Sequence, residues 1–136
     1  MNVIYQSDDE LKEDEVLELY RSVDWAAAEK PRELMLSLRN SPTLITVRVD
    51  GRLVGLGNAI SDGYLVAYYS HLVVHPEFQS KGIGRALLER MMEPYKGFHQ
   101  QSLTADGDAT EFYKKLGFKR AGRTVPMWIY AGTDHD

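Results

Sequence analysis

Two glycines separated by one residue stand between two basic residues, in the run Lys81-Gly82-Ile83-Gly84-Arg85. A run rich in aromatic and β-branched residues precedes them, and an apolar pattern typical of a helix follows at once. Free N–H groups at a helix start, together with the positive end of the helix dipole, can bind an anion. Glycines let the main chain approach a phosphate closely. The turn could therefore hold a diphosphate, and a turn that only joins a strand to a helix is the alternative.

This glycine turn, residues 79–85, matches neither of two common phosphate-binding motifs. A dinucleotide-binding fingerprint needs a third glycine, but Ala86 and Leu87 follow Gly84 instead. A P-loop needs Gly-Lys followed by Ser or Thr, and the sequence has no such run. The glycine spacing alone does not identify the ligand, so the elements around the turn must limit the choice of ligands.

Hydrophobic periodicity predicts a mixed α/β domain. Apolar residues at three-to-four spacing predict helices over residues 8–22, 31–39, 82–95 and 108–116. Apolar runs with β-branched and aromatic residues predict strands over residues 44–49, 53–60, 64–75, 100–105 and 123–131. The pair Asp50-Gly51 predicts a hairpin between the first two strands. No repeat, low-complexity tract or linker interrupts the chain, so we expect one domain over residues 1–136.

The composition argues against several classes of function. The 136 residues carry a net charge of −4 without a basic stripe, which argues against nucleic-acid binding. No apolar run approaches the roughly 20 residues that cross a bilayer, and the N-terminus lacks a signal sequence. We therefore expect no membrane association and a cytoplasmic location. Because the chain has no cysteine, disulfides, thiolate metal sites and a cysteine nucleophile are excluded.

Acidic and metal-ligating side chains give weaker signals. Acidic residues gather between positions 8 and 18, which indicates a solvated helix face or a field that attracts a cationic substrate. His71 and His75 share a predicted strand face, but at ~3.3 Å per residue they lie about 13 Å apart, too far for one zinc ion. We therefore expect no metal site.

Two segments resemble a known family. The run LVVHPEFQSKGIGRALLERM, residues 72–91, resembles the signature of the GCN5-related N-acetyltransferase (GNAT) superfamily, where V-x-P-x-x-(Q/R)-x-x-G-x-(G/A) binds the pyrophosphate of acetyl-CoA. The matching positions are Val74, Pro76, Gln79, Gly82 and Gly84. The run ATEFYKKLGFKRAG, residues 109–122, is similar to the family's A-x-x-F-Y-x-x-x-G-F segment. The resemblance covers at least residues 42–131. It implies the GNAT fold, a mixed central β-sheet with two N-terminal helices on one side and two C-terminal helices around a cofactor cleft.

The resemblance also implies which residues bind acetyl-CoA. In the family, the strand before the glycine turn pairs its main-chain groups with the pantetheine arm, which corresponds here to Leu72, Val73 and Val74. The pyrophosphate would meet the N–H groups of the glycine turn. The residues implied there are Gln79, Ser80, Lys81, Gly82, Ile83, Gly84 and Arg85, and the second motif adds Ala109 and Tyr113.

Tyr113 matches the family's tyrosine near the cofactor sulfur, which implies a role as general acid. Attack by an amine expels a thiolate. A thiol has a pKa of about 8.5 and tyrosine one of about 10, so proton transfer to sulfur as its charge builds is feasible. The alternative role for Tyr113 is a core aromatic residue beside Phe112 and Phe118.

The sequence leaves the general base open. Many relatives place Glu or His about six residues before the position of Val74, where this chain has Tyr68. Strand alternation predicts Ser70 on the face of Tyr68 and His71 on the opposite face. The candidates are His71, a water chain ordered by Tyr68 and Ser70, or no dedicated base. A lone histidine on a strand is more often structural than catalytic.

Three further positions bear on the site. Asp106 stands where the family commonly has asparagine, and we expect Asp106 or Asp108 to cap the helix that follows. The acceptor would enter near the first two helices, beside Trp25 and Asp62. Asp62 either holds a substrate ammonium group or only shapes the turn that it forms with Ser61 and Gly63.

The resemblance implies an acetyl-CoA-dependent N-acetyltransferase that acts on a primary amine by direct attack in a ternary complex. The alternative is a non-catalytic CoA-binding sensor or interaction module on the same fold. The missing strand carboxylate favours the module, and Tyr113 favours the enzyme. The acceptor stays open among polyamines, aryl-alkylamines, amino sugars, amino acids and proteins. A homodimer is open as well, because the tail strand with Trp128 and Tyr130 could pair between subunits.

Overall fold

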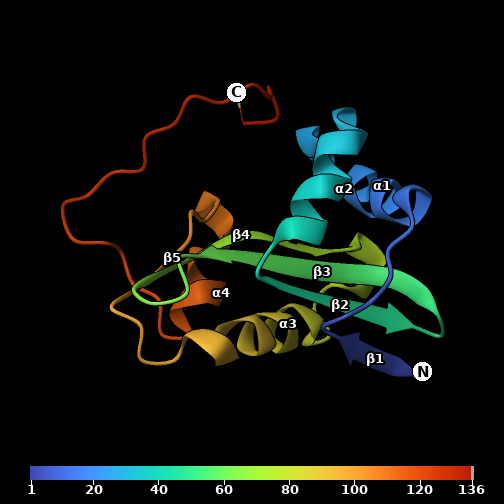
Figure 1. Ribbon diagram of the computed structural model, residues 1–136, viewed down its shortest axis with the longest axis horizontal. Coiled ribbons are helices and arrows are strands. Elements are labelled where there is room, and N and C mark those ends of the chain that lie inside the picture. The colour runs from blue at the N-terminus through green and yellow to red at the C-terminus, as the bar shows by residue number, and fades with distance from the viewer. Residues whose placement is uncertain (136) are drawn as a thin grey trace.

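Five strands in the order β1-β2-β3-β4-β5 form the central sheet of the computed structural model, which describes residues 1–135 (Figure 1). Position 136, the end of the predicted domain, lies outside them. Neighbouring strands from β1 to β4 are antiparallel, whereas β5 runs parallel to β4. The strands are β1 (Val3–Gln6), β2 (Thr43–Val49), β3 (Arg52–Ser61), β4 (Val66–Val74) and β5 (Gln100–Ser102).

Helices cover both faces of the sheet. One face carries α1 (Glu13–Ser22), the 3₁₀ helix η1 (Ala26–Glu29) and α2 (Pro31–Asn40), and the other carries α3 (Ile83–Met92) and the short α4 (Thr110–Lys114) (Figure 1). Three 3₁₀ turns complete the chain, namely η2 (Pro76–Phe78), η3 (Glu93–Tyr95) and η4 (Gly107–Ala109). This is the α/β architecture that the sequence predicts. In the described part of the chain, every helix is too short or too polar to cross a membrane.

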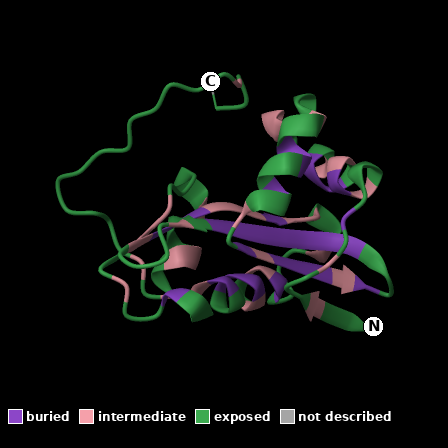
Figure 2. Cartoon of the chain, in the orientation of Figure 1, coloured by how far each residue is buried: buried purple, intermediate pink, exposed green. Residues whose placement is uncertain are grey.

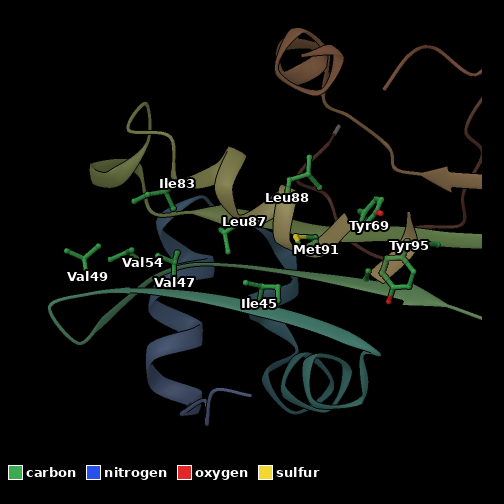
Figure 3. Close-up of a cluster of buried hydrophobic side chains, with 12 residues drawn as sticks. Ile45, Val47, Val49, Val54, Tyr69, Ile83, Leu87, Leu88, Met91 and Tyr95 are labelled. Carbon is green, nitrogen blue, oxygen red and sulfur yellow. The ribbon is translucent and has the colours of Figure 1, made fainter. Parts of the chain in front are cut away.

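The spacing of apolar residues on α3 explains how this helix attaches to the sheet. Ile83, Leu87, Leu88 and Met91 recur every three or four residues, and all four are buried against the sheet (Figure 3). Full burial of each such side chain contributes about 1.5–3 kcal/mol. Figure 2 shows the matching buried band along β3.

Gly57 on β3 lets α3 approach the sheet closely. A Cβ built at this position would overlap the sulfur of Met91, so only glycine leaves room for that side chain. The contact holds α3 against β3 over its last turns. It therefore helps to fix the place at which the N-terminus of α3 meets the end of β4.

Three of the acidic residues at the start of the chain form ion pairs with arginines of the sheet. Arg48 on β2 donates its guanidinium hydrogens to Asp9 and to Glu15, each at 2.8 Å. Its neighbouring guanidinium holds the pKa of Glu15 below its ordinary value. Arg52 lies 3.0 Å from Glu18 in a more exposed pair. Asp9, Glu15 and Glu18 therefore join α1 and the segment before it to the sheet. Helix α1 begins at Glu13, not at position 8 as predicted.

The structure differs from the sequence predictions at both chain ends. β1 was not predicted, because its four residues lack a long alternating run and flanking turn residues. The strand predicted over residues 123–131 is absent, since this segment is extended but pairs with no strand among residues 1–135. Pro126 removes one donor from it, and the neighbouring β5 is only three residues long.

Candidate functional site

A cleft opens where β4 and β5 separate. The two strands pair over only three positions, from Val66 with Gln100 to Tyr68 with Ser102. Beyond Tyr68, β4 continues to Val74 beside β3 alone. The second half of β4 therefore has one unpaired edge, and this edge faces the cleft.

The main-chain groups that point into this cleft belong to Leu72 and Val74. The N–H of His71 and the carbonyls of His71 and Val73 are directed towards β3, as the 3.0 Å bond from His71 N to Asn58 Oδ1 shows. Successive residues of a strand direct these groups to opposite edges. The edge facing the cleft thus offers the N–H and carbonyl of Leu72 and the N–H of Val74, while the main chain of Val73 faces β3. Of the three predicted strand residues, two can pair with a ligand.

The glycine turn presents a continuous row of unbonded donors. Among residues 1–135, none accepts a hydrogen bond from the main-chain N–H groups of residues 80–85, and the first bond of α3 runs from Ala86 N to Gly82 O at 3.1 Å. Ser80 and Gly82 both have positive φ, 63° and 83°. Left-handed residues at alternate positions turn consecutive N–H groups inward, which forms an anion-binding concavity. The helix dipole of α3 adds to this positive potential.

The side chain of Gln79 braces the turn. Its Nε2 donates to the carbonyl oxygen of Val74 at 2.9 Å, so the loop is held against the end of β4. The side-chain N–H of Gln79 is thus used within the fold, and its predicted role in cofactor binding stays a prediction. Lys81 pairs with no carboxylate within the described residues 1–135, and its Nζ lies 5.8 Å from the ring centre of Phe78. Arg85 is paired with Glu89 at 2.8 Å.

Tyr113 lies at the inner end of the cleft. A cavity of about 180 Å³ is lined by Trp25, Tyr69, Ser70, Leu72, Leu88, Leu103, Thr104, Asp106, Ala109 and Tyr113. The hydroxyl of Tyr113 has no hydrogen-bond partner within residues 1–135. Burial raises the pKa of Tyr113, and the charge of Asp106 raises it further, so the phenol keeps its proton at neutral pH. The cavity therefore contains an available proton donor.

A β-bulge at Ser70 overturns the predicted faces of β4. Asn58 pairs with His71 and Ala59 with Tyr69, so Ser70 is an extra residue on β4. The bulge interrupts the alternation, and His71 comes to lie on the side of α1, against Tyr20 and Trp25. Ser70 lines the cavity, whereas the hydroxyl of Tyr68 lies 3.2 Å from Thr104 Oγ1 at its far wall. Strict alternation places His71 on the face of Tyr69, which packs in the core beside α3, but His71 packs against Tyr20 and Trp25 on the α1 side, so the predicted face of His71 is wrong.

His71 is held by two partners that sequence reasoning missed. Tyr20 Oη lies 2.8 Å from His71 Nδ1, and the buried Asn58 accepts the main-chain N–H of His71. Burial raises the pKa of Tyr20 and lowers that of His71, so both are neutral near pH 7. Tyr20 is fully buried, and its hydroxyl hydrogen has only Nδ1 to bind within the described chain. Tyr20 is therefore the donor, and Nε2 of His71 carries the imidazole proton. Asn58 was detectable as a polar residue inside an apolar strand run.

Trp25 and Asp62 have different environments. Trp25 lines the cavity and packs edge-on against Tyr20 and His71, with ring centres 5.8 and 5.5 Å apart. Asp62 is not among the cavity-lining residues. Its Oδ1 accepts three main-chain N–H groups, from Tyr64, Leu65 and Val66, and these bonds lower its pKa. The turn role of Asp62 explains its contacts, and the predicted substrate role has no support from the geometry.

The predicted helix caps differ from the structure. Asp106 occupies the N-cap position of η4 but forms no side-chain cap bond there, and α4 has no side-chain cap bond either. Asp106 instead lines the cavity, with Oδ1 3.5 Å from His135 Nδ1.

Within residues 1–135 no three His, Asp or Glu side chains are grouped closely enough to hold a metal ion.

Comparisons with known proteins agree on one family. The model of the acetyltransferase (GNAT) domain family matches residues 40–120. A protein of Pyropia yezoensis, named uncharacterized N-acetyltransferase ycf52, is 31% identical over 111 residues, which are 76% of this chain and 63% of the relative. The chloroplastic serotonin N-acetyltransferase 2 of Oryza sativa subsp. japonica is 37% identical over 70 residues, 50% of this chain and 35% of the relative. The chain thus spans less than two thirds of either relative.

A solved structure has the same fold. The GNAT-family acetyltransferase of Streptococcus pneumoniae superposes with a TM-score of 0.82 at 24% identity. The superposition covers 96% of this chain and 100% of that chain. At this level of identity the likeness concerns the fold alone.

Proposed function

We propose that this chain, which belongs to the GNAT acetyltransferase family, transfers an acetyl group from acetyl-CoA to a primary amine by direct attack in a ternary complex. One observation carries the proposal. The open edge of β4 continues along the chain into the glycine turn with its unbonded N–H groups, and Leu72 on that edge lines the same cavity as Tyr113, whose hydroxyl has no partner within residues 1–135.

The cleft fits acetyl-CoA at two distinct places. The N–H groups of residues 80–85 match the charge and the hydrogen-bonding needs of a pyrophosphate, and Lys81 adds a cation beside them. The main chain of Leu72 and Val74 would pair with the amides of the pantetheine arm, as a sheet edge pairs with an added strand. Ala109 lines the same cavity as Tyr113, and its small side chain leaves space for a ligand there. When bound, acetyl-CoA supplies the activated acyl thioester.

Tyr113 would act as the general acid. Its raised pKa keeps the phenolic proton in place until negative charge develops on the leaving sulfur, to which the proton is then donated. Amide N–H groups on the open edge of β4 would stabilise the charge that develops on the carbonyl oxygen. Both tasks need donors, and the cavity offers donors that are not used by the fold.

His71 suits a positioning role better than that of a base. Its Nδ1 accepts from Tyr20 and its Nε2 carries a proton, so neither nitrogen is free to take one from an amine. We assign His71 and Tyr20 to the support of Trp25, the residue that faces the cavity. The amine would then lose its proton to water near Ser70, without a dedicated base. The pair of Tyr68 with Thr104 frames the opposite wall.

A non-catalytic CoA-binding module is the second candidate. The observation that favours it is the lack of a general base: Nδ1 of His71 accepts from Tyr20, Nε2 of His71 carries a proton, and β4 has no carboxylate at the position where many relatives have one. In such a module the glycine turn would still bind the pyrophosphate, but Tyr113 would serve only packing against Phe112 and Phe118.

Thiol release with acetyl-CoA and a panel of amines separates the two candidates. The chain has no cysteine, so a thiol reagent reports CoA release without background from the protein. An aryl-alkylamine belongs first in the panel, because the rice relative is named a serotonin N-acetyltransferase. Polyamines, amino sugars, amino acids and peptides follow. Turnover with any amine supports the enzyme, and tight CoA binding without turnover across the panel supports the module.

Tyr113→Phe tests the acid role within the same assay. Loss of a positioned proton donor lowers kcat by about 100-fold or more, while CoA affinity stays within a few fold. Tyr69→Phe is the matched control, since Tyr69 lines the same cavity but donates its hydroxyl to Gln101 at 2.6 Å. Equal rates for wild type and Tyr113→Phe would remove Tyr113 from the chemistry.

A further inference from the structure

The end of the chain contacts both sides of the cavity that contains Tyr113. After α4 the chain runs away from the sheet and returns towards η1, as the red segment of Figure 1 shows. Its last described residues, 130–135, are here called the C-terminal strap. On one side, Asp134 Oδ2 accepts the N–H of Ala26 in η1 at 3.0 Å. On the other side, His135 Nδ1 lies 3.5 Å from Asp106 Oδ1, at the start of η4.

Both attachment points belong to the walls of the cavity or lie next to them. Trp25, the residue before Ala26, lines the cavity on the side of η1, and Asp106 lines it on the side of β5 and α4. A second hollow, of about 380 Å³, shares Trp25 with the cavity. Thr133 and Asp134 of the strap form part of its wall. The strap therefore bounds the space next to the cavity, beside Trp25.

The strap is shaped to fit against η1. Tyr130 Oη donates to Asp134 Oδ1 at 2.7 Å, which leaves the other carboxylate oxygen for Ala26. The side chain of Asp134 is only 15% exposed. A Cβ built on Gly132 would lie 2.9 Å from the Cβ of Ala26, so a glycine is needed for the strap to come this close. These contacts give the strap one defined closed position.

Few contacts hold the strap to the body of the molecule. The residues that lead to it, 123–129, are exposed throughout (Figure 2). Among residues 1–135, its polar contacts with the body are the hydrogen bond to Ala26 and the pair with Asp106. A segment with few buried contacts opens locally at a free-energy cost well below that of global unfolding. A lid needs this combination of a defined closed position and a low cost of opening.

We propose that the C-terminal strap is a lid that closes the acceptor side of the cavity and opens to admit the amine. In the closed position Asp134 holds η1, and His135 holds Asp106. The role of the lid in catalysis rests on the proposed function, whereas its closed position does not. With acetyl-CoA along the β4 edge and at the glycine turn, the amine has to approach the thioester from another side. The closed strap keeps water from the thioester on that side.

The lid gives a reason for the aspartate at position 106, where the family commonly has asparagine. A carboxylate can form an ion pair with a protonated imidazole, whereas the neutral amide of asparagine cannot. The rings of Trp128 and Tyr130 lie 5.4 and 5.6 Å from the ring of His135 and pack against it. They support the imidazole in the position from which it reaches Asp106.

Hydrogen exchange of the Ala26 amide tests the closed position without reference to catalysis. Asp134→Ala removes the acceptor of this N–H, and Gly132→Ala forces the strap away from Ala26. Both variants should raise the exchange rate of the Ala26 amide by about ten-fold or more. Asp8→Ala removes an exposed carboxylate before α1 and should leave the rate unchanged. If the Ala26 amide of the wild type already exchanges as fast as a free amide, the proposal is overturned.

A reversible lock tests whether the strap controls access to the cavity. The chain has no cysteine, so Ala26→Cys together with Gly132→Cys introduces a single pair. Their Cβ atoms would need to move apart by about 1 Å to reach the 3.8 Å of a disulfide. Mild oxidation should remove two hydrogens from the mass of the double variant and none from Ala26→Cys alone. A double variant that forms no such disulfide overturns the closed position.

Acrylamide quenching of Trp25 reports access in the absence of chemistry. It is measured with Trp128→Phe in the background, because Trp128 is the only other tryptophan. Quenching should fall when the disulfide forms and recover when a phosphine reduces it. In Asp134→Ala it should exceed that of the wild type.

The lock also has a kinetic readout. The oxidised double variant should bind CoA as the reduced form does in calorimetry, but it should form acetylated amine about ten-fold more slowly or less. Equal Trp25 quenching, or equal turnover, in the oxidised and reduced forms would show that the strap is not a lid. If the wild type turned over no amine at all, the proposed function would fail, while the quenching experiment would still decide whether the strap controls access.

Discussion

The hydroxyl of Tyr20 lies 2.8 Å from Nδ1 of His71, and this bond determines which imidazole nitrogen carries the proton. The two residues are 51 positions apart in the sequence and meet because α1 packs on the face of β4 that the bulge at Ser70 turns towards it. The bond places His71 behind Trp25 as a support. It also leaves Tyr113 as the cavity's free side-chain donor whose pKa favours a protonated phenol.

Replacing Tyr20 with phenylalanine should change the tautomer of His71. The variant removes the donor to Nδ1, so that this half-buried nitrogen loses its partner, and the free energy of unfolding falls by about 1–3 kcal/mol. In the wild type, two-bond ¹H–¹⁵N spectra should show Nε2 protonated, and in the variant both tautomers should be populated. Tyr64→Phe, at an exposed turn position, is the control and should change neither quantity. An unchanged spectrum for Tyr20→Phe would show that the bond does not select the tautomer.

The stability of the protein should fall in mild acid because of His71. Burial lowers the folded-state pKa of His71 below its usual 6.5, so the unfolded chain binds a proton at a higher pH than the folded chain does. Stability attributable to this residue is complete above pH 6.5 and declines as the pH falls towards the folded-state pKa. Urea unfolding of the wild type and of His71→Gln between pH 5 and 8 should reveal the difference. Parallel profiles for the two proteins would contradict the neutral, buried state of His71.

The alkaline limb of the rate profile should report Tyr113. Because burial and Asp106 raise the pKa of Tyr113 above 10, kcat should stay level through pH 10 if the phenol is the acid. Asp106→Asn removes the charge that is the smaller of the two causes, so its profile should bend at a lower pH. Steady-state rates at saturating amine, with the protein's integrity checked at each pH, measure this. If the pH profile of kcat in Asp106→Asn matched that of the wild type, Asp106 would not influence the pKa of the general acid.

The two glycines of the turn should respond differently to alanine. Gly82 has φ of 83°, a conformation that costs an L-residue about 1–2 kcal/mol, so Gly82→Ala should lower the free energy of unfolding by that amount. Gly84 lies within α3, and a Cβ there would meet the ring of Phe112 at an ordinary 3.5 Å. Gly84→Ala should therefore be neutral or stabilising, because alanine is the better helix former. Urea titrations of both variants test this order, and equal losses would contradict it.

Local patterns predicted the elements that carry the site. The glycine turn, the helix after it and Tyr113 were placed by two motifs and by three-to-four spacing, and the Asp50-Gly51 hairpin by its turn residues. These features depend on neighbours in the sequence. The wall of the cavity contributed by Leu103 and Thr104 depends on where β5 leaves β4, and no local pattern marks that point.

Long-range contacts explain what could not be predicted. Strict alternation placed His71 on the face opposite Tyr68, whereas Asn58 holds the main chain of His71 and stabilises a bulge that shifts the alternation. The tail strand was inferred from its composition, but a strand also needs a pairing partner, and residues 123–131 pair with no strand among residues 1–135. β1 forms because β2 provides an edge for its four residues to pair with, although these residues lack a long apolar alternation.

The most direct test follows the amide signals of residues 80–85 during a titration with CoA in ¹H–¹⁵N correlation spectra. Hydrogen bonds from these amides to the pyrophosphate should shift their proton signals downfield and saturate together. Pantetheine, which lacks the pyrophosphate, should leave these signals in place while it moves those of Leu72 and Val74. If CoA at millimolar concentration left residues 80–85 unmoved, the glycine turn would not bind the pyrophosphate, and the proposed use of the cleft would be contradicted.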